Sequence, residues 1–230
     1  MSLDRALELA AVAAGVAYPN PTVGAVVVAD GEVVGEGVTE RYGGRHGEVV
    51  ALAAAGDRAR GSTLYVTMEP CAHHGTTPPC VDAVVATGVA RVVAGCLDPN
   101  PEAAGGLERL RRAGIEAELD DRFEARQQNE AWRTWTSAGR PFVTYKVAAT
   151  LDGRVTVPGR RWVTGEASRR LVHELRAASD AVAVGMGTVR ADARQSQPCL
   201  GFFRTRRRRR RRVGRRRSGQ DASRGCPARR

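Results

Sequence analysis

The chain has 230 residues, 42% of them hydrophobic, which is enough for one large domain or two smaller ones with buried cores. No apolar stretch reaches the roughly 20 residues that span a bilayer, and the N-terminus has no charged segment followed by an apolar one. We therefore expect neither a membrane protein nor a secreted one. The five cysteines are odd in number and irregular in spacing, which argues against a disulfide framework. A cytoplasmic protein is expected, in which clustered cysteine and histidine indicate metal.

The formal net charge of +11 comes from the C-terminal segment. Residues 204–230 contain 14 of the 36 basic residues and one of the 25 acids, so the preceding 203 residues carry a net charge of −2. Seven consecutive arginines at 206–212 cannot be buried in a core and predict disorder. An arginine run binds nucleic-acid phosphates without sequence preference, so non-specific binding through this tail is the only nucleic-acid contact expected.

Before the tail, helical and strand-like patterns alternate along the chain. Apolar residues at helical spacing predict a first helix over 3–14, and two β-branched runs separated by Gly31 predict a hairpin over 22–38. Later apolar runs, bounded by glycine and proline, continue the alternation. They predict helices over 46–55, 80–87, 106–113, 121–137 and 165–178, and strands over 64–67, 89–95, 115–119, 142–149 and 180–184.

A hairpin followed by helix–strand units predicts an α/β fold with a layered sheet of mixed strand directions. Gly139-Arg140-Pro141 interrupts the pattern, so we place a domain boundary near 140. The expected organisation is a first domain over 1–140, an incomplete second domain over 141–194 and the tail over 195–230. So short a second unit is marginal for a core of its own and leaves strand edges and an apolar face open, which would favour a homo-oligomer.

Four residues of the first domain have the spacing of a catalytic zinc site: His46, Glu48, Cys71 and Cys80. Zinc binds imidazole and thiolate, and a catalytic site keeps three protein ligands and leaves a fourth position for water. We predict His46, Cys71 and Cys80 as the ligands of one zinc ion, which lowers the pKa of bound water to about 7. Glu48 would move protons to a ring nitrogen and to departing ammonia. The zinc-deaminase signature is H-x-E followed by P-C-x-x-C, and the two cysteines here lie further apart.

Each of these residues also has an ordinary structural interpretation. A single histidine is commonly a surface residue, and buried cysteines often act as small apolar side chains. A structural zinc would need a fourth ligand, which His73 or His74 could supply. The alternatives left open are a deaminase of the same class that acts on another base, and a nucleic-acid-associating module with a structural zinc. The position of Glu48 favours catalysis.

The stretch from Thr67 to Cys80 resembles the pattern T-x-E-P-C-x-H-x-G-x-T-P-P-C of the riboflavin-biosynthesis deaminases, which are usually bifunctional deaminase–reductases. Asn20-Pro21-Thr22-Val23-Gly24 is similar to that family's N-P-x-V-G loop, and Asp98-Pro99-Asn100-Pro101 to another of its motifs. The resemblance implies a cytidine-deaminase-like three-layer α/β/α domain. It also implies a small-molecule substrate, 2,5-diamino-6-(5-phosphoribosylamino)pyrimidin-4(3H)-one, whose 2-amino group is hydrolysed. Asn20 and His73 would then be substrate-binding residues.

The second unit resembles the beginning of that family's reductase, an NADPH-dependent domain of the dihydrofolate-reductase type. The segments 146–153 and 162–165 are similar to its K-x-A-x-S-L-D-G and W-I-T-G motifs. The resemblance implies substrate binding by Arg176 and NADPH binding by four residues: Ala149, Trp162, Thr188 and Asp192. Two features depart from the family: the loop before Trp162 is about two residues short and carries Arg160 in place of serine, and the similarity ends after Asp192. We expect the reductase activity to be lost, with NADPH bound only if this segment folds.

The similarity ends abruptly, inside a family motif. Our hypothesis is that residues 195–230 are an out-of-frame or degraded extension, with a regulatory interaction tail as the alternative. The coding DNA tests this directly. The hypothesis fails if no shifted reading frame restores the D-P-x-L-T-x-R continuation that the family has at this point.

Overall fold

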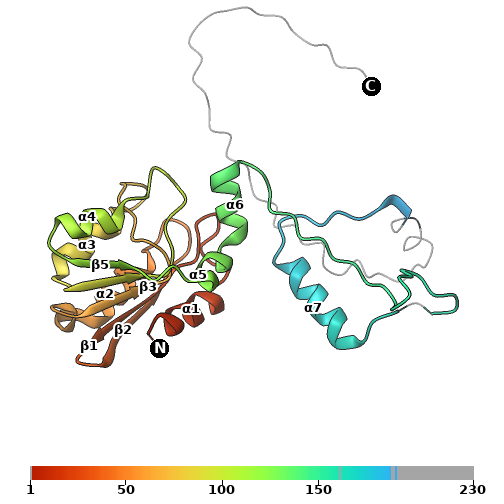
Figure 1. The fold of residues 1–230 in the computed structure, drawn as a ribbon, viewed down its shortest axis with the longest axis horizontal. Helices are drawn as coiled ribbons and strands as arrows, with labels where there is room; N and C mark the ends of the chain where they lie inside the picture. The colour runs from red at the N-terminus through yellow and green to blue at the C-terminus, as the bar shows by residue number, and fades with distance from the viewer. Residues whose placement is uncertain (1, 161, 188–189, 191–230) are drawn as a thin grey trace, which may run out of the picture. The chain divides into compact units, whose positions relative to one another are not determined.

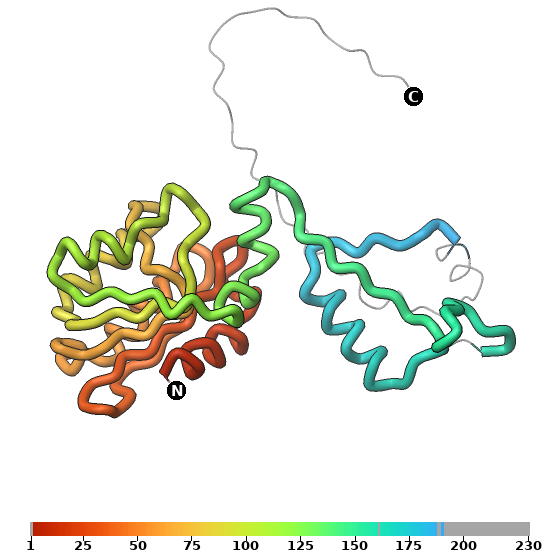
Figure 2. Tube along the Cα trace, in the orientation of Figure 1, coloured from red at the N-terminus to blue at the C-terminus, as the bar shows by residue number. Residues whose placement is uncertain are grey.

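The computed structural model describes residues 2–160, 162–187 and 190. It divides the chain into two compact units, with the division between Val147 and Ala148 (Figures 1 and 2). The C-terminal tail lies outside the described residues, as do the expected NADPH-contacting residues Thr188 and Asp192. No helix in the described part of the chain is both long and apolar enough to cross a membrane.

The first unit is built on a five-stranded sheet with the order β2-β1-β3-β4-β5 (Figure 1). Strand β1 is antiparallel to both of its neighbours, whereas β3, β4 and β5 are parallel, which confirms the predicted mixed sheet. The strands are β1 (Gly24–Ala29), β2 (Glu32–Val38), β3 (Thr63–Val66), β4 (Arg91–Ala94) and β5 (Glu116–Leu119). The helices are α1 (Ser2–Val12), α2 (Gly47–Ala55), α3 (Cys80–Thr87), α4 (Gly106–Arg112), α5 (Phe123–Gln128) and α6 (Glu130–Ala138), with the 3-10 helix η1 (Gly56–Ala59).

Helices cover both faces of the sheet, and successive side chains of a strand point to these two faces in turn. On β1, Val26 packs with Leu3 and Ala6 of α1, whereas Ala25 and Val27 belong to the larger cluster on the other face. Helices α2, α3 and α4 pack on that larger cluster, and α1 packs with α5 (Figure 1). The result is the expected three-layer α/β/α arrangement.

The parallel strands β3 and β4 direct two loops to the same edge of the sheet. Val66 and Ala94, the last residues of β3 and β4, are paired in register. The chain continues from them into residues 67–71 and 95–100. The carboxyl ends of neighbouring parallel strands are where α/β folds place their ligands, so functional side chains are expected at this edge.

The prediction of a single helix over 121–137 is wrong. This segment forms two helices, α5 and α6, that meet at Asn129. The Asn129 backbone departs from helical geometry, and its buried side chain makes two hydrogen bonds to the backbone of Thr22. These long-range bonds hold the junction in place, and the helical periodicity on either side gives no sign of them.

The second unit differs from its prediction in its strands. The helix expected over 165–178 is confirmed as α7 (Glu166–Ala177), and the turn at Asp152-Gly153 is closed by a hydrogen bond from Gly153 N to Thr150 O. The segment 142–149, which crosses the division between the units, and the segment 180–184 were predicted as strands and are not strands in the structure. A strand forms only beside a neighbouring strand that completes its hydrogen bonds, and no strand is present among the described residues after β5.

Candidate functional site

Three side chains that can bind a soft metal ion meet at the carboxyl edge of the sheet. The nearest ligand atoms of His46, Cys71 and Cys80 all lie within 4.8 Å of one another. His46 Nδ1 is 3.1 Å from Cys80 Sγ and 3.6 Å from Cys71 Sγ, so this ring nitrogen faces the two thiols. The structure thus brings together the three predicted ligands. Neither His73 nor His74 belongs to this group among the described residues.

Local structure fixes each of the three donors. His46 is the residue before the first turn of α2, and Cys80 is the first residue of α3, directly after Pro79. Cys71 follows β3 across a short loop, and the backbone N–H of Cys80 donates a hydrogen bond to its sulfur at 3.3 Å. Two helix N-termini therefore face the cluster, and the positive end of a helix stabilises a thiolate.

The electrostatics of the two thiols fit a bound cation. A hydrogen bond between them lowers the pKa of Cys71 and raises the pKa of Cys80. Because like charges repel at this separation, the buried pair holds one negative charge readily and a second only beside a positive ion. Two sulfurs and an imidazole nitrogen form the donor set that zinc prefers in a three-ligand site. The residues present therefore fit a zinc ion.

Glu48 lies in the first turn of α2, and its side chain is almost fully buried, with 3% of its surface exposed. Burial raises the pKa of Glu48 to about 7. Its Oε2 atom is buried and has no hydrogen-bond partner among the described residues. An unpaired buried polar atom lowers the stability of the folded state, so this oxygen is unusual. Glu48 also lines the pocket that contains His46 and Cys71. Such a group can accept and return a proton near neutral pH.

A hydroxyl group that the sequence reasoning missed supports the ligand His46. Thr77 Oγ1 lies 3.4 Å from His46 Nε2, the ring nitrogen that faces away from the thiols. A partner on the second nitrogen fixes the orientation and tautomer of a metal-binding imidazole. Thr77 lies inside the motif between the two cysteines, so its position was a usable signal, but its role depends on the fold of the loop.

A pocket of about 270 Å³ opens beside this cluster. Both residues that we predicted to bind the base, Asn20 and His73, line it, and so do Asp98 and Asn100. His73 Nδ1 is buried and has no hydrogen-bond partner in the described part of the chain. The remaining lining residues come from the N-terminal loop, the β2–α2 region, the loops after β3 and β4, and α6: Pro21, Val23, Thr39, Tyr42, Met68, Glu69, Gly75, Thr76, Thr77, Ala103, Trp132 and Thr136.

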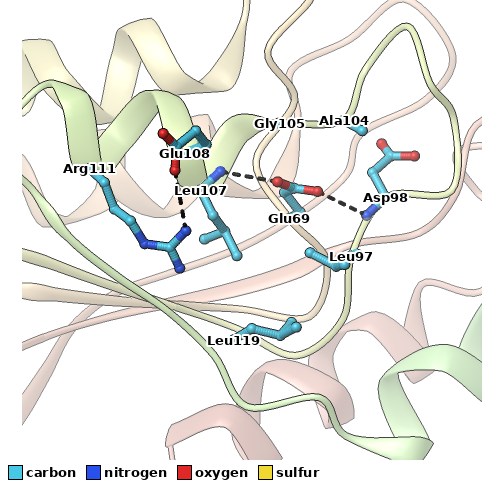
Figure 3. A pocket seen from close by; sticks show the side chains of 9 residues that line it. All are labelled: Glu69, Leu97, Asp98, Ala104, Gly105, Leu107, Glu108, Arg111 and Leu119. Carbon is cyan, nitrogen blue, oxygen red and sulfur yellow. Dashed lines mark hydrogen bonds and ion pairs between the residues drawn. The ribbon is translucent and has the colours of Figure 1, made fainter.

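Glu69, a buried acid that the sequence reasoning did not select, ties the loop after β4 to the loop that carries Cys71. One Glu69 oxygen accepts the backbone N–H of Leu107 at 3.1 Å, and the other accepts that of Asp98 at 3.2 Å (Figure 3). A Cβ on Gly106 would lie 1.7 Å from the carbonyl oxygen of Pro70, so only glycine lets α4 approach this closely. Glu69 and Asp98 also line a second pocket, of about 370 Å³, together with residues of α4 (Figure 3).

We expect Glu69→Gln to lower the free energy of unfolding by about 2–3 kcal/mol, because an acceptor of one buried and one partly buried N–H group becomes an amide whose NH₂ faces one of them. Urea unfolding of the zinc-loaded protein measures this change. Glu108→Gln is the matched control, since Glu108 lines the same pocket but is 55% exposed and pairs with Arg111 and Arg112 at the surface. Such surface pairs contribute about 0–1 kcal/mol. Equal unfolding midpoints for the two variants would show that Glu69 has no anchoring role.

Three of the residues assigned to the reductase function lie among the described residues of the second unit, and all three are exposed. Ala149 and Arg176 are at the surface, and Trp162 is 52% exposed, with its ring centre 5.1 Å from the guanidinium carbon of Arg169. None of these three side chains lines either of the two pockets described above. Their roles in substrate or NADPH binding remain predictions.

Comparison with known proteins divides the chain in a similar way. Residues 2–96 match the family described as cytidine and deoxycytidylate deaminase zinc-binding region, and residues 141–213 match the RibD C-terminal domain. The riboflavin biosynthesis protein RibD of Aquifex aeolicus is 50% identical over 191 residues, which are 81% of this chain and 54% of that protein. RibD of Escherichia coli is 48% identical over 194 residues, 83% of this chain and 53% of that protein.

Solved structures of proteins from the same pathway are also similar to this chain. A diaminohydroxyphosphoribosylaminopyrimidine deaminase/5-amino-6-(5-phosphoribosylamino)uracil reductase from Thermotoga maritima is 43% identical with a TM-score of 0.76, over 83% of this chain and 56% of that one. A RibD structure from Acinetobacter baumannii is 45% identical with a TM-score of 0.74, over 83% and 55%. The chain thus spans about half the length of the relatives it matches. Through both of its units, this chain belongs to the RibD family of riboflavin-biosynthesis proteins.

Proposed function

We propose that the first unit is a zinc-dependent hydrolytic deaminase of 2,5-diamino-6-(5-phosphoribosylamino)pyrimidin-4(3H)-one. The observation that carries this proposal is the buried, unpartnered oxygen of Glu48, in a pocket shared with His46 and Cys71. A structural metal site needs four protein ligands and no acid of this kind. Three donors and a neighbouring proton carrier suit hydrolysis instead.

His46, Cys71 and Cys80 would hold the zinc ion. When bound, zinc supplies a Lewis acid that makes water reactive at neutral pH. Glu48 would take one proton from the attacking water on its free oxygen and deliver it to a ring nitrogen of the substrate. It would then carry a second proton from the hydroxyl group added to the ring to the departing amino group, which leaves as ammonia. A pKa of about 7 suits both directions of transfer, because neither the acid nor the base form is strongly favoured.

The pocket walls orient the pyrimidine ring. His73 Nδ1 and the Asn20 amide offer hydrogen-bonding atoms to the ring substituents, and Asp98 and Asn100 do so from the loop that Glu69 holds in place. The choice of pyrimidine follows from the relatives, one of which is named for this deaminase activity. A nucleic-acid-binding module with a structural zinc is not favoured by any of these contacts.

Ammonia release tests the proposal. The zinc-loaded protein is mixed with the diaminopyrimidinone phosphate, and the amino-uracil product is identified by mass spectrometry. We expect one ammonia for each product molecule formed. Turnover of cytidine, deoxycytidylate or adenosine in place of this compound would assign the site to another deaminase of the same class.

We also propose that this chain does not carry out the NADPH-dependent reduction associated with the second half of its relatives. The described part of the second unit contains helix α7 and leaves Ala149, Trp162 and Arg176 exposed. A dinucleotide site needs a pre-formed cleft that buries most of its ligand. Incubation of the protein with NADPH and the amino-uracil product should give no loss of NADPH absorbance, and steady oxidation would contradict the proposal.

A further inference from the structure

Helix α6 forms a wall of the pocket, although it lies outside the residues that match the zinc-binding family region. Trp132 and Thr136, which are four residues apart and therefore on one helical face, both line the pocket. Trp132 is partly buried and packs against the main core cluster, so its indole ring is held between the core and the pocket. Trp135, on a neighbouring flank of the same helix, is 61% exposed and does not line the pocket.

Polar contacts hold this wall in position. None of the residues of α6 is fully buried, so apolar packing alone fixes the helix weakly. Just before it, buried Asn129 accepts the N–H of Thr22 at 3.0 Å and donates to the carbonyl of the same residue at 2.9 Å. Arg133 donates to the carbonyl of Leu97 at 2.8 Å. The helix is thereby tied to the Asn20–Thr22 loop and to the loop after β4, which form other walls of the same pocket.

The polarity of the pocket indicates which part of a substrate lies against Trp132. Among the described residues that line it, none is lysine or arginine. A phosphate group would therefore meet no strong cation inside the pocket, whereas a planar ring would meet the aromatic side chain of Trp132. Aromatic side chains bind the faces of bases by stacking, which every base permits.

We propose that Trp132 is a further substrate-binding residue, an aromatic wall that contacts the ring of the base, and that Asn129 is the positioning residue that holds this wall against the Asn20–Thr22 loop. This inference rests on the proposed deaminase function. It places ring recognition on α6 and leaves the ribosyl phosphate at the open side of the pocket.

Steady-state kinetics of zinc-loaded variants test the role of Trp132. Trp132→Ala is expected to raise KM for the diaminopyrimidinone phosphate by about tenfold or more, with a smaller effect on kcat. Trp132→Phe keeps an aromatic face and should recover most of the loss. Trp135→Ala is the control from the same helix, and its kinetics should stay within about twofold of the unchanged protein. All four proteins should contain one zinc ion per chain.

Asn129→Asp tests the positioning role, because it keeps the acceptor for the Thr22 N–H and removes the donor to the Thr22 carbonyl. This variant should raise KM by a larger factor than it changes kcat. If Asn129 had a purely structural role, the variant would lower only the melting temperature. Fluorescence gives a second readout that does not depend on turnover. In a Glu48→Gln background, the substrate should change the tryptophan emission of the Trp135→Phe protein and leave that of Trp132→Phe unchanged.

The outcomes separate the two proposals. If the unchanged protein releases ammonia but Trp132→Ala matches Trp135→Ala in KM, the inference about α6 is wrong and the deaminase function stands. If the zinc-loaded unchanged protein releases no ammonia, both proposals are overturned. A substrate-induced emission change that persists in Trp132→Phe would also contradict the aromatic wall.

Discussion

Glu48→Gln is expected to lower the rate of ammonia release by about 10²–10⁴-fold, the usual contribution of a positioned acid–base group. Glutamine has nearly the same shape as glutamate, so it should occupy the same buried position in the first turn of α2. It cannot take up and return a proton, and the transfer to the ring nitrogen and the leaving group is lost. The rate should be measured at saturating substrate, together with zinc content.

The matched control is Glu32→Gln, which removes an exposed carboxylate that pairs with Arg58 at the surface. Its rate should stay within about twofold, because such pairs contribute little. The two variants also distinguish a chemical role from a metal-binding one. A Glu48→Gln protein that lost its zinc would indicate that Glu48 is a ligand, and one with full activity would show that the proton carrier is elsewhere.

The metal-binding cluster could be predicted from the sequence because it depends on a few residue types at a characteristic spacing. His46, Cys71 and Cys80 are the residues that zinc prefers, and helix starts and a strand end bring them together. The strands and helices up to β5 could be predicted from periodicity for a similar reason, since each buries apolar side chains in the clusters on the two faces of the sheet.

The features that the sequence did not reveal depend on partners far along the chain. Asn129 ends one helix and begins another by bonding to Thr22, 107 residues away. The partners of Glu69 are backbone N–H groups 29 and 38 residues later, which have no side-chain signature. The position of Trp132 in the pocket follows from the first of these contacts. Side-chain-to-backbone bonds of this kind appear only when the fold is known.

The strands predicted over 142–149 and 180–184 failed for a different reason. Their β-branched pattern describes which residues suit a strand, but a strand also needs an adjacent edge to complete its hydrogen bonds. Several of their apolar side chains are exposed in the structure, such as Val143, Tyr145 and Val184. The strand propensity of these two segments is therefore not matched by tertiary contacts.

Removal of the metal ion is expected to abolish ammonia release and to lower the melting temperature. Binding to the folded state alone stabilises it by about 4 kcal/mol when free zinc is 1,000 times its dissociation constant. For a unit of this size, that corresponds to a shift of roughly 10 °C. Cys80→Ala should reproduce the loss of activity, because it removes a buried ligand with no exposed surface. Its melting temperature should no longer respond to added zinc.

Cys96→Ala is the control that separates the ligand role from the packing role of a cysteine. Cys96 is equally buried, and its sulfur contacts the carbonyl of Thr67 and the side chain of Arg133, but it is not part of the metal-binding cluster. Its replacement should cost some stability both with and without zinc, and it should leave zinc content and ammonia release unchanged. A zinc-dependent shift that is the same in Cys80→Ala as in Cys96→Ala would place the metal outside this cluster, because only a ligand couples ion binding to the stability of the fold.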